Sequence, residues 1–225
     1  KKKDDPAPDS APMAAPESPG NGPGASVPGP VALDGLWRIT NAADASGKKY
    51  SGNVQVSRSG EAWEMAWKLH DGSTQGGIGM DLGNGVLAAG WGGTQAYGVV
   101  VYDVAGGTLT GKWAQKGLKT LGVENLTGPP GLNGTYTITL GKGPTGAAYD
   151  GTLRIIPNGQ LYDLTWVTGG STQKGVAILD GTKLIAGWGI ANGAGFVKYQ
   201  VSASRLDGVW APVGGNRTAI EILER

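Results

Sequence analysis

The chain has 225 residues and contains no cysteine, one histidine and one phenylalanine. The absence of cysteine excludes disulfide bonds, thiolate metal sites and cysteine nucleophiles. A single histidine without cysteine leaves a structural zinc site without its usual ligands, so we expect no metal and no other cofactor. No apolar run reaches the roughly 18 to 20 residues of a membrane-spanning helix, so no transmembrane helix is expected.

The chain also has no excess of charge of one sign. It carries 19 lysines and arginines against 18 aspartates and glutamates. Proteins that bind nucleic acids usually present a strongly basic surface to the phosphates. We therefore expect no nucleic-acid partner.

Residues 1–30 differ in composition from the rest of the chain. They contain eight of the 13 prolines and no aromatic residue. Such a segment buries too little apolar surface to offset the entropy lost on ordering, which predicts a disordered tether. The charged start followed by a Pro/Ala/Ser/Gly spacer resembles the tether of a bacterial lipoprotein, which implies a lipid anchor upstream of Lys1; the alternative is a trimmed end. The expected location is extracytoplasmic: an outer-membrane lipoprotein, the periplasm, or secreted.

The remainder of the chain consists of two copies of one sequence repeat. Residues 33–126 align with residues 132–223 at an offset of 99 positions, which becomes 97 further along, and residues 127–131 join the two copies. Aromatic and acidic residues are retained at equivalent positions, pairing Tyr50 with Tyr149, Trp67 with Trp166, Trp91 with Trp188, Tyr102 with Tyr199, Trp113 with Trp210 and Glu124 with Glu221. Internal repetition of this kind predicts two similar structural units.

Each copy shows the period of β-strands and no helical period. In residues 63–68, Trp, Met and Trp alternate with Glu, Ala and Lys, which is typical of a half-buried strand. Glycine, 42 residues in all, is frequent at the turns between such runs. We predict an all-β fold of two tandem eight-stranded antiparallel up-and-down barrels, one per copy. The alternative is one larger β-sandwich or sheet shared by both copies.

A short motif recurs at the first strand and near the last strand of each copy. The pattern Leu-x-Gly-x-aromatic occurs at Leu33–Trp37, Leu109–Trp113, Leu132–Tyr136 and Leu206–Trp210. The opening Gly-x-Trp is similar to the first-strand signature of lipocalins and avidins, which implies an eight-stranded ligand-binding barrel without specifying its ligand. The full pattern resembles a Gly/Trp-rich repeat of exported bacterial proteins of uncharacterised function.

Four residues are the candidate ligand-binding residues. Trp91 and Trp188 are flanked by glycines, and they form flat platforms for stacking on sugar rings if they are exposed. Glu124 and Glu221 lie among apolar residues of the last strands and are expected to accept hydrogen bonds from indole or phenol groups, or from a ligand. We expect the tryptophans mainly to pack the barrel interiors, with an aromatic ligand pocket as the alternative.

Val99 and Val101 are candidate interface residues. Residues 99–102 of copy one are apolar on both faces of the expected strand, whereas Lys198 replaces Val101 in copy two. An apolar residue on an otherwise solvent-facing side must be covered. We expect these valines to contact the sister barrel or another subunit.

The sequence contains no recognisable set of catalytic residues. A Ser-His-Asp triad would depend on His70, the single histidine, and no nucleophile-elbow motif is present. The function expected is therefore a noncatalytic binding or scaffold protein of the bacterial envelope, lipid-anchored or secreted, with an unknown protein or glycan as partner. The alternatives are a lectin-like carbohydrate-binding module and, third, a hydrolase with a carboxylate pair.

Overall fold

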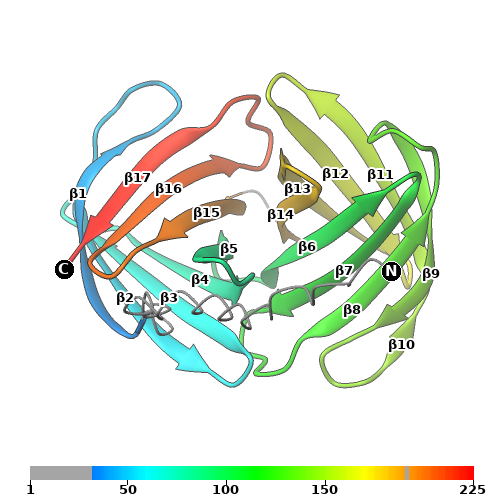
Figure 1. Ribbon diagram of the computed structural model, residues 1–225, viewed down its shortest axis with the longest axis horizontal. Coiled ribbons are helices and arrows are strands. Elements are labelled where there is room, and N and C mark those ends of the chain that lie inside the picture. Colours follow the sequence, from blue (N-terminus) through cyan, green and yellow to red (C-terminus); the bar gives the residue numbers. More distant parts are fainter. Residues whose placement is uncertain (1–31, 191–192) are drawn as a thin grey trace, which may run out of the picture. The chain divides into compact units, whose positions relative to one another are not determined.

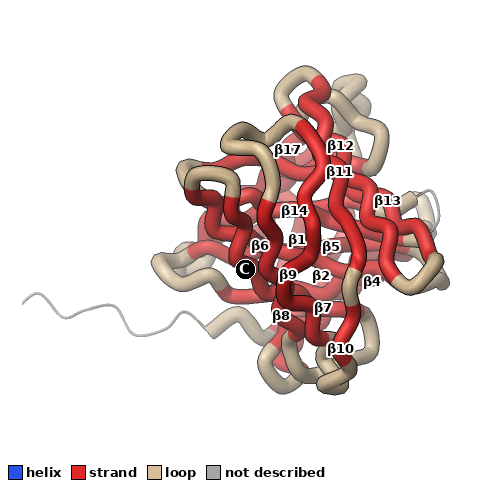
Figure 2. The backbone as a smooth tube through the Cα atoms, turned by 90° about the vertical axis from the view of Figure 1, so that its right-hand side faces the viewer, coloured by secondary structure: helices blue, strands red, loops and turns tan. Residues whose placement is uncertain are grey.

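The computed structural model describes residues 32–190 and 193–225, and the expected tether lies outside them. The described part contains only strands, turns and loops (Figure 2). None of its elements is a helix that could cross a membrane. The strands close into two eight-stranded antiparallel barrels, which confirms the predicted fold class.

The first barrel combines the beginning and the end of the described chain. Its strands, in barrel order, are β1 (Gly35–Ala43), β2 (Gly52–Ser59), β3 (Ala62–Leu69), β4 (Thr74–Asp81), β5 (Val86–Gly92), β15 (Gly195–Val201), β16 (Arg205–Pro212) and β17 (Ala219–Glu224). Pairing of β17 with β1 closes the ring. In Figure 1 this barrel therefore carries both the blue and the red ends of the colour scale.

The second barrel contains the middle of the chain. Its strands are β6 (Tyr97–Ala105), β7 (Thr108–Gln115), β8 (Gly122–Thr127), β9 (Gly134–Lys142), β11 (Gly151–Asn158), β12 (Leu161–Thr168), β13 (Ser171–Asp180) and β14 (Lys183–Gly189), with the short β10 (Ala148–Tyr149) beside β9. Pairing of β8 with β9 and of β14 with β6 closes this ring.

The barrels do not coincide with the sequence copies, and this corrects the expected domain boundaries. Each barrel consists of five strands from the first part of one copy and the last three strands of the other copy. This exchange occurs because β5 pairs with β15 and β14 pairs with β6. Residues 33–126 and 132–223 each contribute to both barrels, and residues 127–131 connect two neighbouring strands of the second barrel. The sandwich alternative is wrong, although strands of both copies do share each sheet.

Glycines permit the chain to cross from the first barrel to the second between β5 and β6. A Cβ on Gly90 would lie 1.9 Å from the carbonyl oxygen of Gly98, and a Cβ on Gly187 would lie 2.0 Å from that of Gly195. At both places two backbones touch face to face with no side chain between them, which only glycine permits. This close approach lets the chain leave one barrel at its wall and enter the other.

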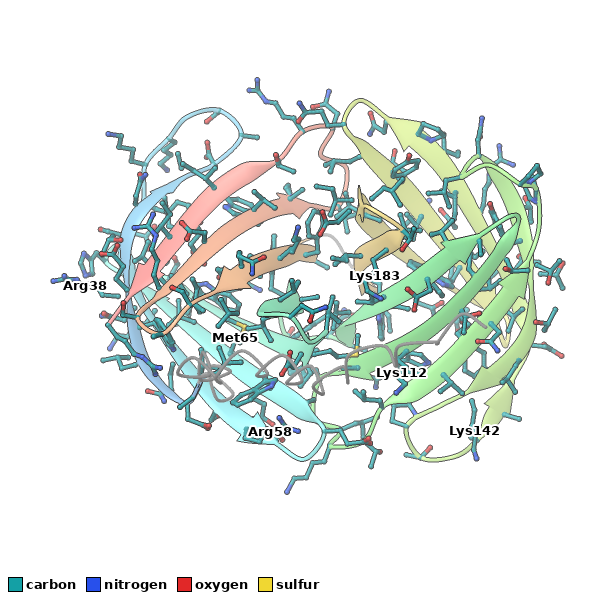
Figure 3. All side chains as sticks on the ribbon, viewed as in Figure 1. Arg38, Arg58, Met65, Lys112, Lys142 and Lys183 are labelled. Carbon is teal, nitrogen blue, oxygen red and sulfur yellow. The ribbon has the colours of Figure 1, made fainter. Side chains whose placement is uncertain are left out.

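Three apolar clusters fill the structure. One fills the first barrel around Trp37 and Met65, another fills the second barrel around Tyr136 and Leu153, and a third lies between the barrels. In Figure 3 the buried Met65 lies within the first barrel, while Arg38, Arg58 and Lys142 project around the periphery. The alternation read from the sequence thus separates interior from solvent face, as a half-buried strand requires.

The cluster between the barrels contains both predicted interface residues. Val99 is fully buried and Val101 is 8% exposed. They pack in the same cluster as Ile78, Ala88 and Phe196 of the first barrel. The valines therefore contact the other barrel, one of the two partners expected for them.

Lys198, the residue equivalent to Val101, has a different environment. It forms a salt bridge with Asp180 of β13. Asp81 pairs with Leu87, and Leu179 pairs with Leu184, which is the residue equivalent to Leu87. Asp81 and Leu179 are therefore equivalent positions. The next residues in the chain, Leu82 and Asp180, are equivalent as well. Leu82 packs against the apolar cluster between the barrels, so one copy has an apolar pair where the other has an ion pair.

Candidate functional site

A buried carboxylate lies at the centre of each candidate site. Glu221 of β17 is 3% exposed, in the first barrel. Three neutral groups donate hydrogen bonds to it: the Trp67 indole at 3.0 Å, the Tyr50 hydroxyl at 3.0 Å and the Tyr199 hydroxyl. The glutamate thus accepts hydrogen bonds from indole and phenol groups, one of the two roles expected of it.

The second barrel repeats this arrangement with the equivalent residues. Glu124 of β8 is 4% exposed. Its donors are the Tyr149 hydroxyl at 2.8 Å, the Trp166 indole at 3.2 Å and the Tyr102 hydroxyl. The same four side chains therefore form the same network twice.

Each network is built half from one copy and half from the other. Tyr50 and Trp67 belong to copy one, whereas Tyr199 and Glu221 belong to copy two. The exchange of strands between the barrels brings them together. Sequence reasoning grouped the aromatic residues of each copy into one barrel, and that grouping is wrong, because equivalent positions are exchanged between the barrels.

The glycines of the recurring motif position two of these tyrosines. A Cβ on Gly208 would lie 2.6 Å from the Tyr199 ring, and one on Gly111 would lie 2.4 Å from the Tyr102 ring. The missing side chain therefore leaves room for an aromatic ring of the neighbouring strand. In both barrels the ring is that of a tyrosine, and its hydroxyl donates a hydrogen bond to the glutamate.

Aromatic rings at steep angles to one another form the wall beside each carboxylate. In the first barrel the Trp210 ring centroid lies 6.1 Å from that of Tyr50 and 5.9 Å from that of Trp91, with interplanar angles of 75° in both pairs. In the second barrel Trp113 has the same relation to Tyr149 at 6.2 Å and to Trp188 at 6.0 Å. Edge-to-face contacts of this kind stabilise the wall and fix the ring orientations.

A cavity opens at each of these walls. The first has a volume of about 530 Å³ and is lined by Trp67, Trp91, Trp210, Tyr50, Gln75 and Glu221 together with charged residues at its rim. The second has a volume of about 240 Å³ and is lined by the equivalent side chains, including Trp166, Trp188, Trp113, Tyr149, Gln173 and Glu124. The larger volume falls within the range of ordinary small-molecule sites.

The two cavities differ at the entrance, here called the rim, and are alike at the buried glutamate and its donors, here called the floor. Asp44, Lys48 and Lys49 border the first cavity, whereas Gly143, Ala147 and Ala148 occupy the equivalent positions at the second. In the first rim, Asp44 holds its own turn by accepting hydrogen bonds from Ser46 and from the backbone of Lys48. The copies therefore share the chemistry of the floor and differ in what surrounds the entrance.

Burial sets the protonation properties of the site. It raises the pKa of the Glu221 carboxyl, against the opposing effect of its three hydrogen-bond donors. Burial and the neighbouring glutamates also raise the pKa of the Tyr199 and Tyr102 hydroxyls well above their usual value. The tyrosines therefore remain neutral donors at physiological pH.

The structure unites the four candidate binding residues in two pairs across the copies. Trp91 lies with Glu221 at the first cavity, and Trp188 lies with Glu124 at the second. Both tryptophans are half-buried cavity walls, so they are not the exposed flat platforms considered from the sequence. Among the described residues no group of three or more acidic or histidine side chains is placed to hold a metal ion.

The tyrosines and two glutamines were not among the site residues expected from the sequence. Tyr50 and Tyr199 contact the carboxylate directly, and Gln75 lines the first cavity as Gln173 lines the second. The signal was present, because the tyrosines are retained in both copies beside the glutamates. The contact between these tyrosines and the glutamates could not be inferred from the sequence, because it depends on which copy supplies each strand of a barrel.

Comparison of the chain with known protein families, with curated proteins and with solved structures found no match. The fold and the two sites therefore define the class: a protein of two strand-exchanged antiparallel β-barrels, each with an aromatic cavity over a buried glutamate.

Proposed function

We propose that the protein is a noncatalytic binding protein of the bacterial envelope that holds a small ligand in the mouth of the first barrel. The observation that carries this proposal is the cavity of about 530 Å³ over Glu221, walled by Trp91 and Trp210. Cavities of this size that combine apolar walls with a few fixed polar groups are the usual form of a ligand site. The envelope location rests on the composition of residues 1–30.

The fixed geometry of the floor favours binding over chemistry. All three donors to Glu221 are phenol or indole groups, and they hold its oxygens in place. At the rim, Asp44 and Asp71 each accept hydrogen bonds within their own turns, from Ser46 and Ser73. Hydrogen bonds to the charged form lower the pKa of both aspartates, so neither is suited to donate a proton.

A ligand screen with a cavity-blocking variant tests this proposal. Thermal unfolding is measured for the full chain with a library of sugars, amines and carboxylates. A ligand at about 100 times its Kd stabilises the native state by about 2.7 kcal/mol. Leu69 lines the first cavity, so the Leu69→Trp variant should lose the stabilisation. Leu36→Trp, at a site that is 60% exposed on β1, is the matched control and should retain it.

The proposal fails if no compound stabilises the protein, or if Leu69→Trp responds to every ligand as the unaltered protein does. Cell fractionation of the source organism tests the location separately, and recovery of the protein in the cytosol would contradict the envelope assignment.

A carbohydrate ligand is the second candidate. The side-chain nitrogen of Gln75 is buried at the first cavity without a hydrogen-bond partner among the described residues. A sugar hydroxyl is a suitable acceptor for it, and the adjacent tryptophans offer apolar contact. A glycan array, repeated with Gln75→Ala, distinguishes this candidate: glycan binding that depends on Gln75 supports it.

A further inference from the structure

The two buried glutamates lack a cationic partner. The salt bridges among the described residues join other side chains, and every donor to Glu221 and Glu124 is neutral. Burying an ionised carboxylate is costly unless a positive charge compensates it. No cationic side chain therefore contacts either carboxyl group directly, although Lys48 and Lys49 border the entrance of the first cavity.

One oxygen of each carboxylate also has unused acceptor capacity. In Glu221, Oε1 accepts hydrogen bonds from Trp67 and Tyr199, whereas Oε2 accepts only from Tyr50. In Glu124 the division is the same, and Oε2 accepts only from Tyr149. A carboxylate accommodates about four donors, so in each site one acceptor position is unfilled. The N–H of a partly methylated ammonium can fill it, whereas a quaternary ammonium has no N–H and interacts with the carboxylate through its charge alone.

The aromatic walls attract positive charge as well. Three rings stand beside Glu221, and their successive angles of 75° form a corner. Aromatic faces attract a cation through the ring quadrupole, and the attraction grows when the cation is desolvated. A corner of rings fits a compact, rounded group better than a flat sugar ring, which stacks on one open face.

We propose that both cavities bind the head group of a methylated or quaternary ammonium compound, seated between the aromatic walls and the glutamate. This proposal rests on the proposed binding function and specifies its ligand class. Because the floors are equivalent, each chain holds two such sites. The smaller cavity, about 240 Å³, accommodates the head group alone, and the larger one leaves room for a substituent.

The test compares choline with 3,3-dimethylbutan-1-ol, its uncharged carbon isostere, by titration calorimetry on the full chain. We expect choline to bind with a stoichiometry of two and the isostere to bind at least about tenfold more weakly. This comparison uses the unaltered protein and does not depend on the folding of a variant. Equal binding of the two compounds, or no binding of choline, overturns the proposal.

Matched variants assign the sites. Glu221→Gln and Glu124→Gln should each reduce the choline stoichiometry from two to one. Glu64→Gln, which alters an exposed carboxylate on β3, should leave it at two. Unchanged stoichiometry in both buried-site variants would overturn the proposal.

Two further experiments identify the source of the head group and distinguish failure of the ammonium proposal from failure of the proposed binding function. Co-sedimentation with phosphatidylcholine vesicles but not phosphatidylglycerol vesicles identifies a lipid head group, and binding of free choline alone identifies a soluble cation. If choline fails but a neutral ligand binds in a manner that Leu69→Trp abolishes, the ammonium proposal falls and the binding function stands. If Leu69→Trp changes the binding of no ligand, the binding function itself falls.

Discussion

The close contact between the two barrels at Gly90 and Gly98 can be tested with the Gly90→Ala variant. The added Cβ would lie 1.9 Å from the carbonyl oxygen of Gly98 and 2.3 Å from its carbonyl carbon. Non-bonded heavy atoms prefer a separation of about 3.5 Å, so the two strands must move apart by roughly 1.5 Å. Both contacting atoms are backbone atoms of a paired strand and cannot turn away.

That displacement also loosens the apolar cluster between the barrels. A gap of about 0.5 to 1 Å already removes a quarter to a half of the dispersion attraction between facing atoms. Val99 follows Gly98 in the chain, belongs to this cluster and is fully buried. We expect Gly90→Ala to lower the free energy of unfolding by about 3 to 5 kcal/mol, the upper end of overpacking effects.

The assay is urea unfolding followed by tryptophan fluorescence, with Gly93→Ala as the matched control. A Cβ on Gly93 meets nothing within 4 Å, so this variant should differ from the unaltered protein by no more than about 0.5 kcal/mol. Equal unfolding midpoints for Gly90→Ala and Gly93→Ala would refute the close crossing. Gly187→Ala should cost as much as Gly90→Ala, and the double variant should cost less than the sum, because one alanine already separates the barrels.

Three further predictions follow from the same structure. Val101→Lys should destabilise the protein by about 3 kcal/mol because it buries an unpaired charge between the barrels, and adding Leu82→Asp should recover part of the loss in a double-mutant cycle of urea unfolding. Stability should fall by about 2 kcal/mol between pH 10 and pH 11, because Tyr102 and Tyr199 ionise in the unfolded chain while their raised pKa keeps them neutral in the folded protein; unfolding that stays independent of pH there would contradict this. Residues 33–126 alone should form an intertwined dimer by sedimentation, since β5 and β6 each need a partner strand from an equivalent copy, and a stable monomer would count against strand exchange.

The sign of the pH effect follows from the direction of the shift. Tyr199 and Tyr102 are fully buried and their pKa values are raised. A group whose pKa is raised on folding contributes stability below its unfolded pKa, about 10 for tyrosine, and that contribution is lost as the pH rises above this value. Tyr50 and Tyr149 add a smaller effect in the same direction because they are partly exposed.

The sequence alone determined the strand pattern, the class of two closed barrels and the two buried glutamates. Alternation in residues 63–68 and in its equivalents predicted which side chains face inward, and the retained Glu124 and Glu221 marked the buried carboxylates. The apolar run at Val99–Val101 predicted a covered face. These features depend on local period and on hydrophobicity, which a linear pattern records.

Only the tertiary structure decided which copy supplies each strand. Because β5 and β14 are equivalent, and β6 and β15 are equivalent, pairing within a copy and pairing between copies satisfy the same alternation, the same turns and the same side-chain partners. The choice depends on the contact of Gly90 with Gly98 and of Gly187 with Gly195, where two walls meet without side chains between them. That contact joins distant surfaces in space, so no local pattern in the sequence encodes it, and it determines that each binding site is built from both copies.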